Sequence, residues 1–174
     1  MKLNIFIKKT CFVVALFLFF VPAHSEEKQI SANEHKFNFY SGMLDFNDGG
    51  KRSTVFGIQH QNETLIRDSF LGTLSPVSGV LITADNASYF YTGVQAQYNI
   101  GKINLTPSFT PGLYNAGDGK DLGHVVEFKS EIQLSLDLFT DTELGFSYNH
   151  ISNASLDEKN PGANSYMFNF FKQF

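Results

Sequence analysis

The chain has 174 residues, with 13 basic and 17 acidic side chains and a net charge of −4 at pH 7. An acidic chain of this kind disfavours a nucleic-acid partner, because binding to phosphates requires a basic surface. The single cysteine, Cys11, excludes an intramolecular disulfide. Phenylalanine is unusually abundant, with 19 residues, so a large apolar surface must be accommodated somewhere.

The first 25 residues have the layout of a secretory signal peptide. Three lysines accompany an apolar run over residues 11–21, and small residues lead up to Ser25. The run is too short to span a bilayer as a helix. We therefore predict cleavage after Ser25 and one domain over residues 26–174, which keeps 10 basic and 17 acidic side chains.

Apolar and polar residues alternate along the rest of the chain with the period of two that is typical of strands. The alternation predicts eight strands, at about residues 35–46, 52–62, 72–85, 88–100, 103–114, 122–138, 141–152 and 164–174. Stretches rich in Gly, Asn and Asp separate them. Pro107 and Pro111 fall within one predicted strand, and the sequence alone does not say how a sheet compensates for the donors they lack.

Alternation alone fits two architectures: a soluble, lipocalin-like barrel with an apolar interior, or an outer-membrane barrel with an apolar exterior. The secretion signal favours the membrane, and so do strands of ten or more residues. The C-terminal "YMFNFFKQF" also resembles a closing barrel strand, although Lys172 interrupts its aromatic series. We predict an all-β, eight-stranded antiparallel barrel in the outer membrane of a Gram-negative bacterium.

The connections suggest an orientation. With both termini in the periplasm, the short "NIGK" and "FTDT" turns fall on that side, and the longer "NAGDGKDLG" and "NASLDEKNPGA" lie outside. The polar set Glu127, Lys129 and Glu131 then forms a charge network in the lumen. The strand over residues 141–152 ends on the outer side, at His150 and Ser152.

His150 and Ser152 share the lipid-facing side of that strand with Leu144, Phe146 and Tyr148. Residues two apart on a strand are separated by about 6–7 Å, within reach of modest side-chain bending. A serine hydroxyl becomes a nucleophile when a base such as histidine takes its proton. By itself, however, a His-x-Ser sequence is common and does not establish catalysis.

The surrounding residues are more specific. "HISNASLDEKNPGANS", preceded by "FTPGLYNAGDG" and "DLGHVVEFKSEIQLSLDL", resembles the PagL family of outer-membrane lipid A 3-O-deacylases. The shared features are a His-x-Ser-Asn strand end followed by Asn-Pro-Gly, and upstream Gly-x-Tyr and Leu-Gly-x-x-x-Glu-Phe patterns. The resemblance covers the mature chain and is strongest over residues 109–174.

This resemblance implies a metal-free and cofactor-free esterase that removes the acyl chain at the 3-position of lipid A. Ser152 corresponds to the nucleophile and His150 to the general base, while the family's third residue, a glutamate, is replaced by Asn164. An amide oxygen can still accept the imidazole N–H. Asp157 or Glu158 is the alternative partner for the ring.

Donors for the oxyanion are expected from the backbone at Asn153 and Ala154 and from the side chain of Asn160, which can equally be a turn residue before proline. The predicted partner is lipid A within lipopolysaccharide, and a homodimer is left open. A non-enzymatic small barrel with a structural or adhesive role is the alternative function.

Overall fold

The computed structural model describes residues 35–62, 65, 67–69 and 71–174, so the predicted signal peptide lies outside the described residues. These residues form nine strands, namely β1 (His35–Leu44), β2 (Ser53–Asn62), β3 (Arg67–Ser69), β4 (Gly72–Thr83), β5 (Ser88–Ile100), β6 (Ile103–Asn115), β7 (Val126–Phe139), β8 (Thr142–Ser152) and β9 (Ala163–Gln173). None of the described residues forms a helix long and apolar enough to cross a membrane.

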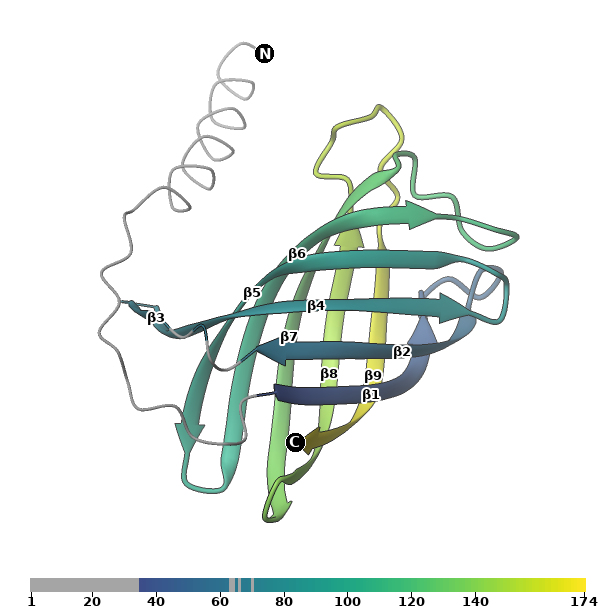
Figure 1. The fold of residues 1–174 in the computed structure, drawn as a ribbon. Coiled ribbons are helices and arrows are strands. Elements are labelled where there is room, and N and C mark those ends of the chain that lie inside the picture. The colour runs from purple at the N-terminus through teal and green to yellow at the C-terminus, as the bar shows by residue number, and fades with distance from the viewer. Residues whose placement is uncertain (1–34, 63–64, 66, 70) are drawn as a thin grey trace.

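Eight of the strands close into a barrel (Figure 1). Each long strand pairs antiparallel with its neighbour in the chain, β9 pairs with β1, and β2 pairs with β4. The short β3 only extends the edge of β4, and three residues are too few to produce a visible alternation. The predicted eight-stranded antiparallel barrel is therefore confirmed.

One strand begins later than predicted. β7 starts at Val126 and not at Leu122. Gly123 has a left-handed backbone, with φ of +98°, and its N–H donates to Asp121 Oδ1 at 2.9 Å, so the chain turns here. Leu122 is fully buried although it belongs to this loop, so its apolar character did not indicate a strand position.

The side chains have the polarity of a membrane barrel. Large apolar residues on the outer face are more than half exposed, as for Phe56, Phe90, Ile132 and Phe168. The interior holds buried polar residues, among them Gln59, Gln95, Glu131, Asn149 and Asn169. Because a closed barrel pairs its backbone groups internally, such an exterior can face lipid. The soluble, lipocalin-like alternative required the opposite polarity and was wrong.

The β5–β6 ladder accommodates both prolines of β6. Pro107 and Pro111 have partners on β7, at Ile132 and Phe128, but neither has a partner in the register with β5. The missing donors thus coincide with two interruptions of a single ladder. Gly93 lies opposite the second interruption, where a Cβ atom would approach the Phe109 carbonyl oxygen to 2.2 Å.

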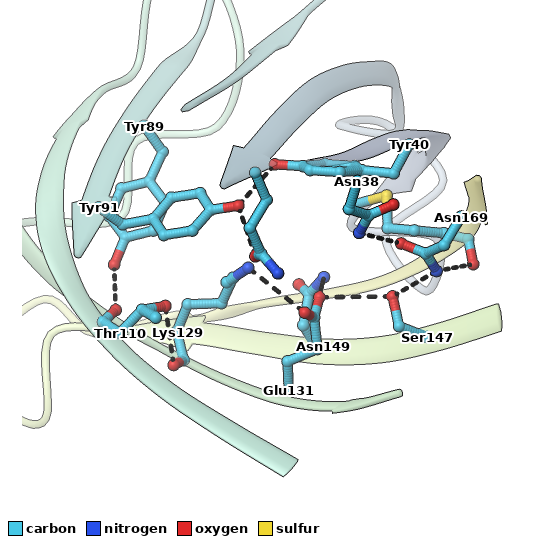
Figure 2. Close-up of polar contacts among 12 residues, drawn as sticks. Asn38, Tyr40, Tyr89, Tyr91, Thr110, Lys129, Glu131, Ser147, Asn149 and Asn169 are labelled. Atoms are coloured by element: carbon cyan, nitrogen blue, oxygen red, sulfur yellow. Dashed lines mark hydrogen bonds and ion pairs between the residues drawn. The ribbon is translucent and has the colours of Figure 1, made fainter. Parts of the chain in front are cut away.

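The lumen contains a network of polar side chains (Figure 2). Lys129 Nζ lies 3.5 Å from Glu131 Oε1 and 4.0 Å from the centre of the Tyr91 ring. Asn149 Nδ2 donates to Glu131 Oε2 at 3.2 Å, and Tyr91 donates to Gln59 Oε1 at 3.0 Å. Lys129 and Glu131 therefore form an ion pair in the lumen, as part of the charge network predicted for Glu127, Lys129 and Glu131.

Glu127 does not join this network. Its carboxylate is buried, and neither oxygen has a hydrogen-bond partner among the residues that the structure describes. The predicted charge network is therefore smaller than the alternation of charged residues suggested.

The two ends of the barrel differ in their connections (Figure 1). One end, called here the short-turn end, carries the two-residue connections at 101–102 and 140–141, together with the longer connection from β2 to β4 that includes β3. Phe174 lies at this end, and its N–H donates to the His35 carbonyl at 3.0 Å. The other end, called the long-loop end, carries residues 116–125 and 153–162. β8 therefore finishes, at Ser152, on the long-loop end.

Candidate active site

A row of polar side chains crosses the otherwise apolar outer wall near the long-loop end. His150 on β8 is the direct cross-strand partner of Ser130 on β7 and of Asn164 on β9. Ser130 and His150 are exposed, and Asn164 is half-buried. These three residues are called the polar row below. Strand register alone brings them together, because they are 14 to 34 positions apart in the sequence.

Asn164 fixes one side of the imidazole. Its Oδ1 lies 2.8 Å from His150 Nδ1. An amide oxygen can only accept, so Nδ1 carries a proton, and in the neutral ring Nε2 then keeps the lone pair. The Tyr148 hydroxyl donates to the same Oδ1, also at 2.8 Å. On the far side, Asn164 Nδ2 lies 3.5 Å from Oδ1 of Asn47, in the β1–β2 connection.

Ser152 is the last residue of β8, two positions beyond His150 and on the same face, and it is half-buried. Its cross-strand neighbour on β7 is Phe128. Within the described parts of the chain, no hydrogen bond joins the Ser152 hydroxyl to the imidazole. A shift of one or both side chains is therefore needed before a proton can pass between them.

Gly162 packs against the Cε1–Nε2 side of the imidazole. A Cβ atom at this position would lie 2.7 Å from His150 Cε1 and 3.2 Å from Nε2. Its φ of +61° also belongs to the left-handed region that favours glycine. The glycine of "NPG" therefore leaves space for the ring where the loop returns to β9.

The loop after Ser152 contains the three residues that the sequence predicted as oxyanion donors. The Asn153 N–H already donates to an oxygen, Asn160 Oδ1, at 3.2 Å. The Asn153 side chain is buried and donates to the carbonyls of Leu122 and Lys159, at 3.0 and 2.8 Å. Ala154 then has a left-handed φ of +53°. The structure thus brings Asn160 to Asn153, with its oxygen and not its NH₂ group facing the backbone.

The two alternative carboxylates do not reach the imidazole. Asp157 and Glu158 are exposed, and Asp157 Oδ1 accepts the Glu158 N–H at 2.6 Å. Neither carboxylate is hydrogen bonded to His150 in the part of the chain that the structure describes. Among the same residues, no group of three His, Cys, Asp or Glu side chains is arranged to hold a metal ion.

Sequence reasoning missed four residues of this region: Ser130, Asn47, Gly162 and Tyr148. Tyr148 was assigned to the lipid-facing side, where it counted as apolar, although its hydroxyl is polar and two positions from His150. Gly162 belongs to the quoted "NPG" motif. The signals for Ser130 and Asn47 did not exist in the sequence, because both depend on which strands are neighbours.

A closed barrel with an apolar exterior, a polar lumen and a polar row on its outer wall is a transmembrane β-barrel of the bacterial outer-membrane type. The family model "Lipid A 3-O-deacylase (PagL)" matches residues 55–173. The chain therefore belongs to the PagL family of lipid A 3-O-deacylases, as its motifs suggested, and the outer membrane of a Gram-negative bacterium is its location.

Solved structures share this fold. A crystal structure of the outer membrane enzyme PagL is 16% identical, with a TM-score of 0.59, over 79% of this chain and 98% of that one. A de novo designed transmembrane β-barrel is 9% identical, with a TM-score of 0.55, over 85% and 100%. Neisserial surface protein A is also 9% identical, with a TM-score of 0.50, over 83% and 98%. No curated protein sequence matches the chain.

Proposed function

We propose that this protein is a serine esterase that removes the ester-linked 3-hydroxyacyl chain at the 3-position of lipid A. The observation that carries this proposal is the lipid-facing imidazole of His150. Its Nδ1 donates to Asn164 Oδ1, which leaves Nε2 as the basic nitrogen of the neutral ring, and Ser152 follows two positions later on the same face. Family membership supports the substrate class.

In the first step, the Ser152 hydroxyl attacks the acyl carbonyl carbon and His150 Nε2 takes the hydroxyl proton. The resulting imidazolium keeps its Nδ1–H on Asn164 Oδ1. Collapse of the tetrahedral intermediate breaks the ester bond, and the departing sugar oxygen takes the proton from Nε2. Water then attacks the acyl-serine, with Nε2 again as the base. Cleavage of the acyl–Oγ bond releases the hydroxy fatty acid, and the proton on Nε2 returns to Ser152 Oγ.

The oxyanion of each tetrahedral intermediate needs donors. We assign this role to the N–H groups of Asn153 and Ala154. The side chain of Asn160 would have to move away from the Asn153 N–H when the oxyanion forms. In the structure, Asn160 Oδ1 accepts the hydrogen bond of the Asn153 N–H. The oxyanion would take the place of this amide oxygen as the acceptor. Rotation of the Asn160 amide would further present its NH₂ group.

The location of the site suits a substrate that never leaves the bilayer. The wall beneath the polar row is apolar, with Ile132, Leu134 and Phe146 about half exposed toward lipid. An acyl chain lying against this wall would bring its ester to the level of Ser152. The missing hydrogen bond between Ser152 and His150 is compatible with catalysis, since such bonds often tighten only when substrate is present.

The Ser152→Ala variant tests the proposal. Cells that express the wild-type protein should yield lipid A lacking one 3-hydroxyacyl chain by mass spectrometry, and cells with the variant should yield intact lipid A. Heat-modifiable migration in a detergent gel checks that both proteins fold.

Ser130→Ala is the matched variant, because it removes the other serine hydroxyl beside His150. Loss of activity in Ser130→Ala but not in Ser152→Ala would transfer the nucleophile to Ser130. An unchanged lipid A profile with folded wild-type protein would favour the non-enzymatic barrel. The observation that supports this alternative is that none of the described carboxylates is hydrogen bonded to His150.

A further inference from the structure

The side-chain amide of Asn164 can face His150 in two orientations that are chemically different, whereas a carboxylate cannot. A carboxylate offers two equivalent oxygens, but an amide offers an acceptor on one side and a donor on the other. With Oδ1 toward the ring, His150 Nδ1 is protonated and Nε2 is free to act as a base. With the amide reversed, Nδ2 would donate to Nδ1, the proton would move to Nε2, and the base would be lost.

Tyr148 contacts the atom that decides this choice. Its hydroxyl lies 2.8 Å from Asn164 Oδ1, and so does His150 Nδ1. The amide oxygen thus accepts two hydrogen bonds from residues that are two positions apart on β8. Reversal of the amide would leave the phenolic proton without this acceptor on a lipid-facing surface, where water is scarce.

We propose that Tyr148 is a positioning residue, which holds the Asn164 amide with its oxygen toward His150 and so maintains the tautomer in which Nε2 is the base. Tyr148 acts only through Asn164 and need not touch the substrate. The catalytic consequence rests on the function proposed above, whereas the effect on the tautomer of His150 does not.

The test is Tyr148→Phe, which removes only the hydroxyl. One hydrogen bond of about 0.5–1.5 kcal/mol corresponds to a loss in kcat of roughly two- to tenfold, and KM should change little. In the histidine ¹⁵N spectrum of the purified protein in detergent micelles, wild-type His150 should show a protonated Nδ1. The variant should show a mixture of the two neutral tautomers.

Tyr166→Phe is the control. Tyr166 is the direct cross-strand partner of Tyr148 and also faces outward, but its hydroxyl lies 3.9 Å from Met43 Sδ and is not bonded to Asn164. This variant loses the same group from the same wall. It should keep both the wild-type kcat and the wild-type ¹⁵N spectrum.

The Tyr148→Phe substitution should also be tested in the Asn164→Glu variant. A carboxylate cannot be reversed, so deacylation should equal or exceed that of the wild type, and adding Tyr148→Phe should then cost less than about twofold. An equal loss in both backgrounds, or a wild-type ¹⁵N spectrum in Tyr148→Phe, would overturn the proposal. If the wild-type protein does not deacylate lipid A, the esterase proposal fails. The ¹⁵N spectra still show whether Tyr148 maintains the tautomer of His150.

Discussion

The lumen and the outer wall of this barrel use neighbouring positions of the same strands for opposite purposes. Glu131 and Asn149 are cross-strand partners inside the barrel, and one position along each strand, Ser130 and His150 are cross-strand partners outside. Inside, the polar groups bond mainly to one another and are buried. Outside, His150 is exposed, and Asn164 is its one hydrogen-bond partner among the described residues. A luminal substitution should therefore change stability, and a substitution at the polar row should change activity.

Lys129→Met is expected to have the largest effect. It leaves the Glu131 carboxylate buried without its ion-pair partner, which costs about 3–5 kcal/mol when an ion pair of this kind loses one member. The free energy of unfolding, measured by urea titration in detergent micelles, should fall by this amount. Deacylation per folded molecule should not change.

A second substitution in the lumen tests whether the unpaired charge causes this loss of stability. Adding Glu131→Gln to Lys129→Met removes the uncompensated charge and should restore much of the lost stability, because the amide can still bond to Asn149. If the single Lys129→Met variant lowered activity and left stability unchanged, the division between lumen and wall would be wrong.

Gly162→Ala should have the next largest effect, and on activity. The added methyl group would lie 2.7 Å from His150 Cε1, so the ring must move. A displacement of about 1 Å in a catalytic group can cost roughly 10²-fold in rate, which is about 2.7 kcal/mol. The measurement is kcat for release of hydroxy fatty acid from lipid A.

Gly101→Ala is the matched control for that variant. Gly101 has a similar φ of +66°, at the short-turn end, but a Cβ atom there would have no heavy atom within 4 Å. Both variants carry the backbone strain of a left-handed alanine, and only Gly162→Ala disturbs the imidazole. Equal activities for the two variants would show that Gly162 is needed for the left-handed backbone of the turn and not for the position of the imidazole.

The smallest effect is expected from Asp121→Asn, in the loop next to the site. Lys159 Nζ lies 2.6 Å from Asp121 Oδ2, and this hydrogen bond holds the pKa of the Asp121 carboxyl below its usual value. The depressed pKa means that the contact stabilises the loops above the ordinary carboxyl pKa and loses this effect as the pH falls through the lowered value. Both side chains are exposed, so the effect is local.

Amide hydrogen exchange over residues 121–123 and 153–160 measures this contact. Protection at neutral pH should fall in Asp121→Asn, and the pH dependence of loop protection below the ordinary carboxyl pKa should weaken. Global stability and kcat should match the wild type. A large fall in kcat would instead make the two loops part of the catalytic machinery.

Much of the fold was readable from the sequence, because strand periodicity is a local property. Alternation located all eight barrel strands, and most of the predicted ends lie within a few residues of the observed ones. The exception at residues 122–125 arose where tertiary packing buried Leu122 in a loop. The small strand β3 was missed because three residues carry no period.

The sequence by itself determined the strands, which side chains share one face of a strand, and the proximity of His150 to Ser152, since all of these follow from positions along one strand. The family resemblance had already assigned Asn164 to His150, but only the tertiary structure decided which further residues surround the ring. Ser130, Gly162 and, through Asn164, Tyr148 converge on one imidazole because closure of the sheet fixes the register between β7, β8 and β9. No pattern within a single strand encodes that register.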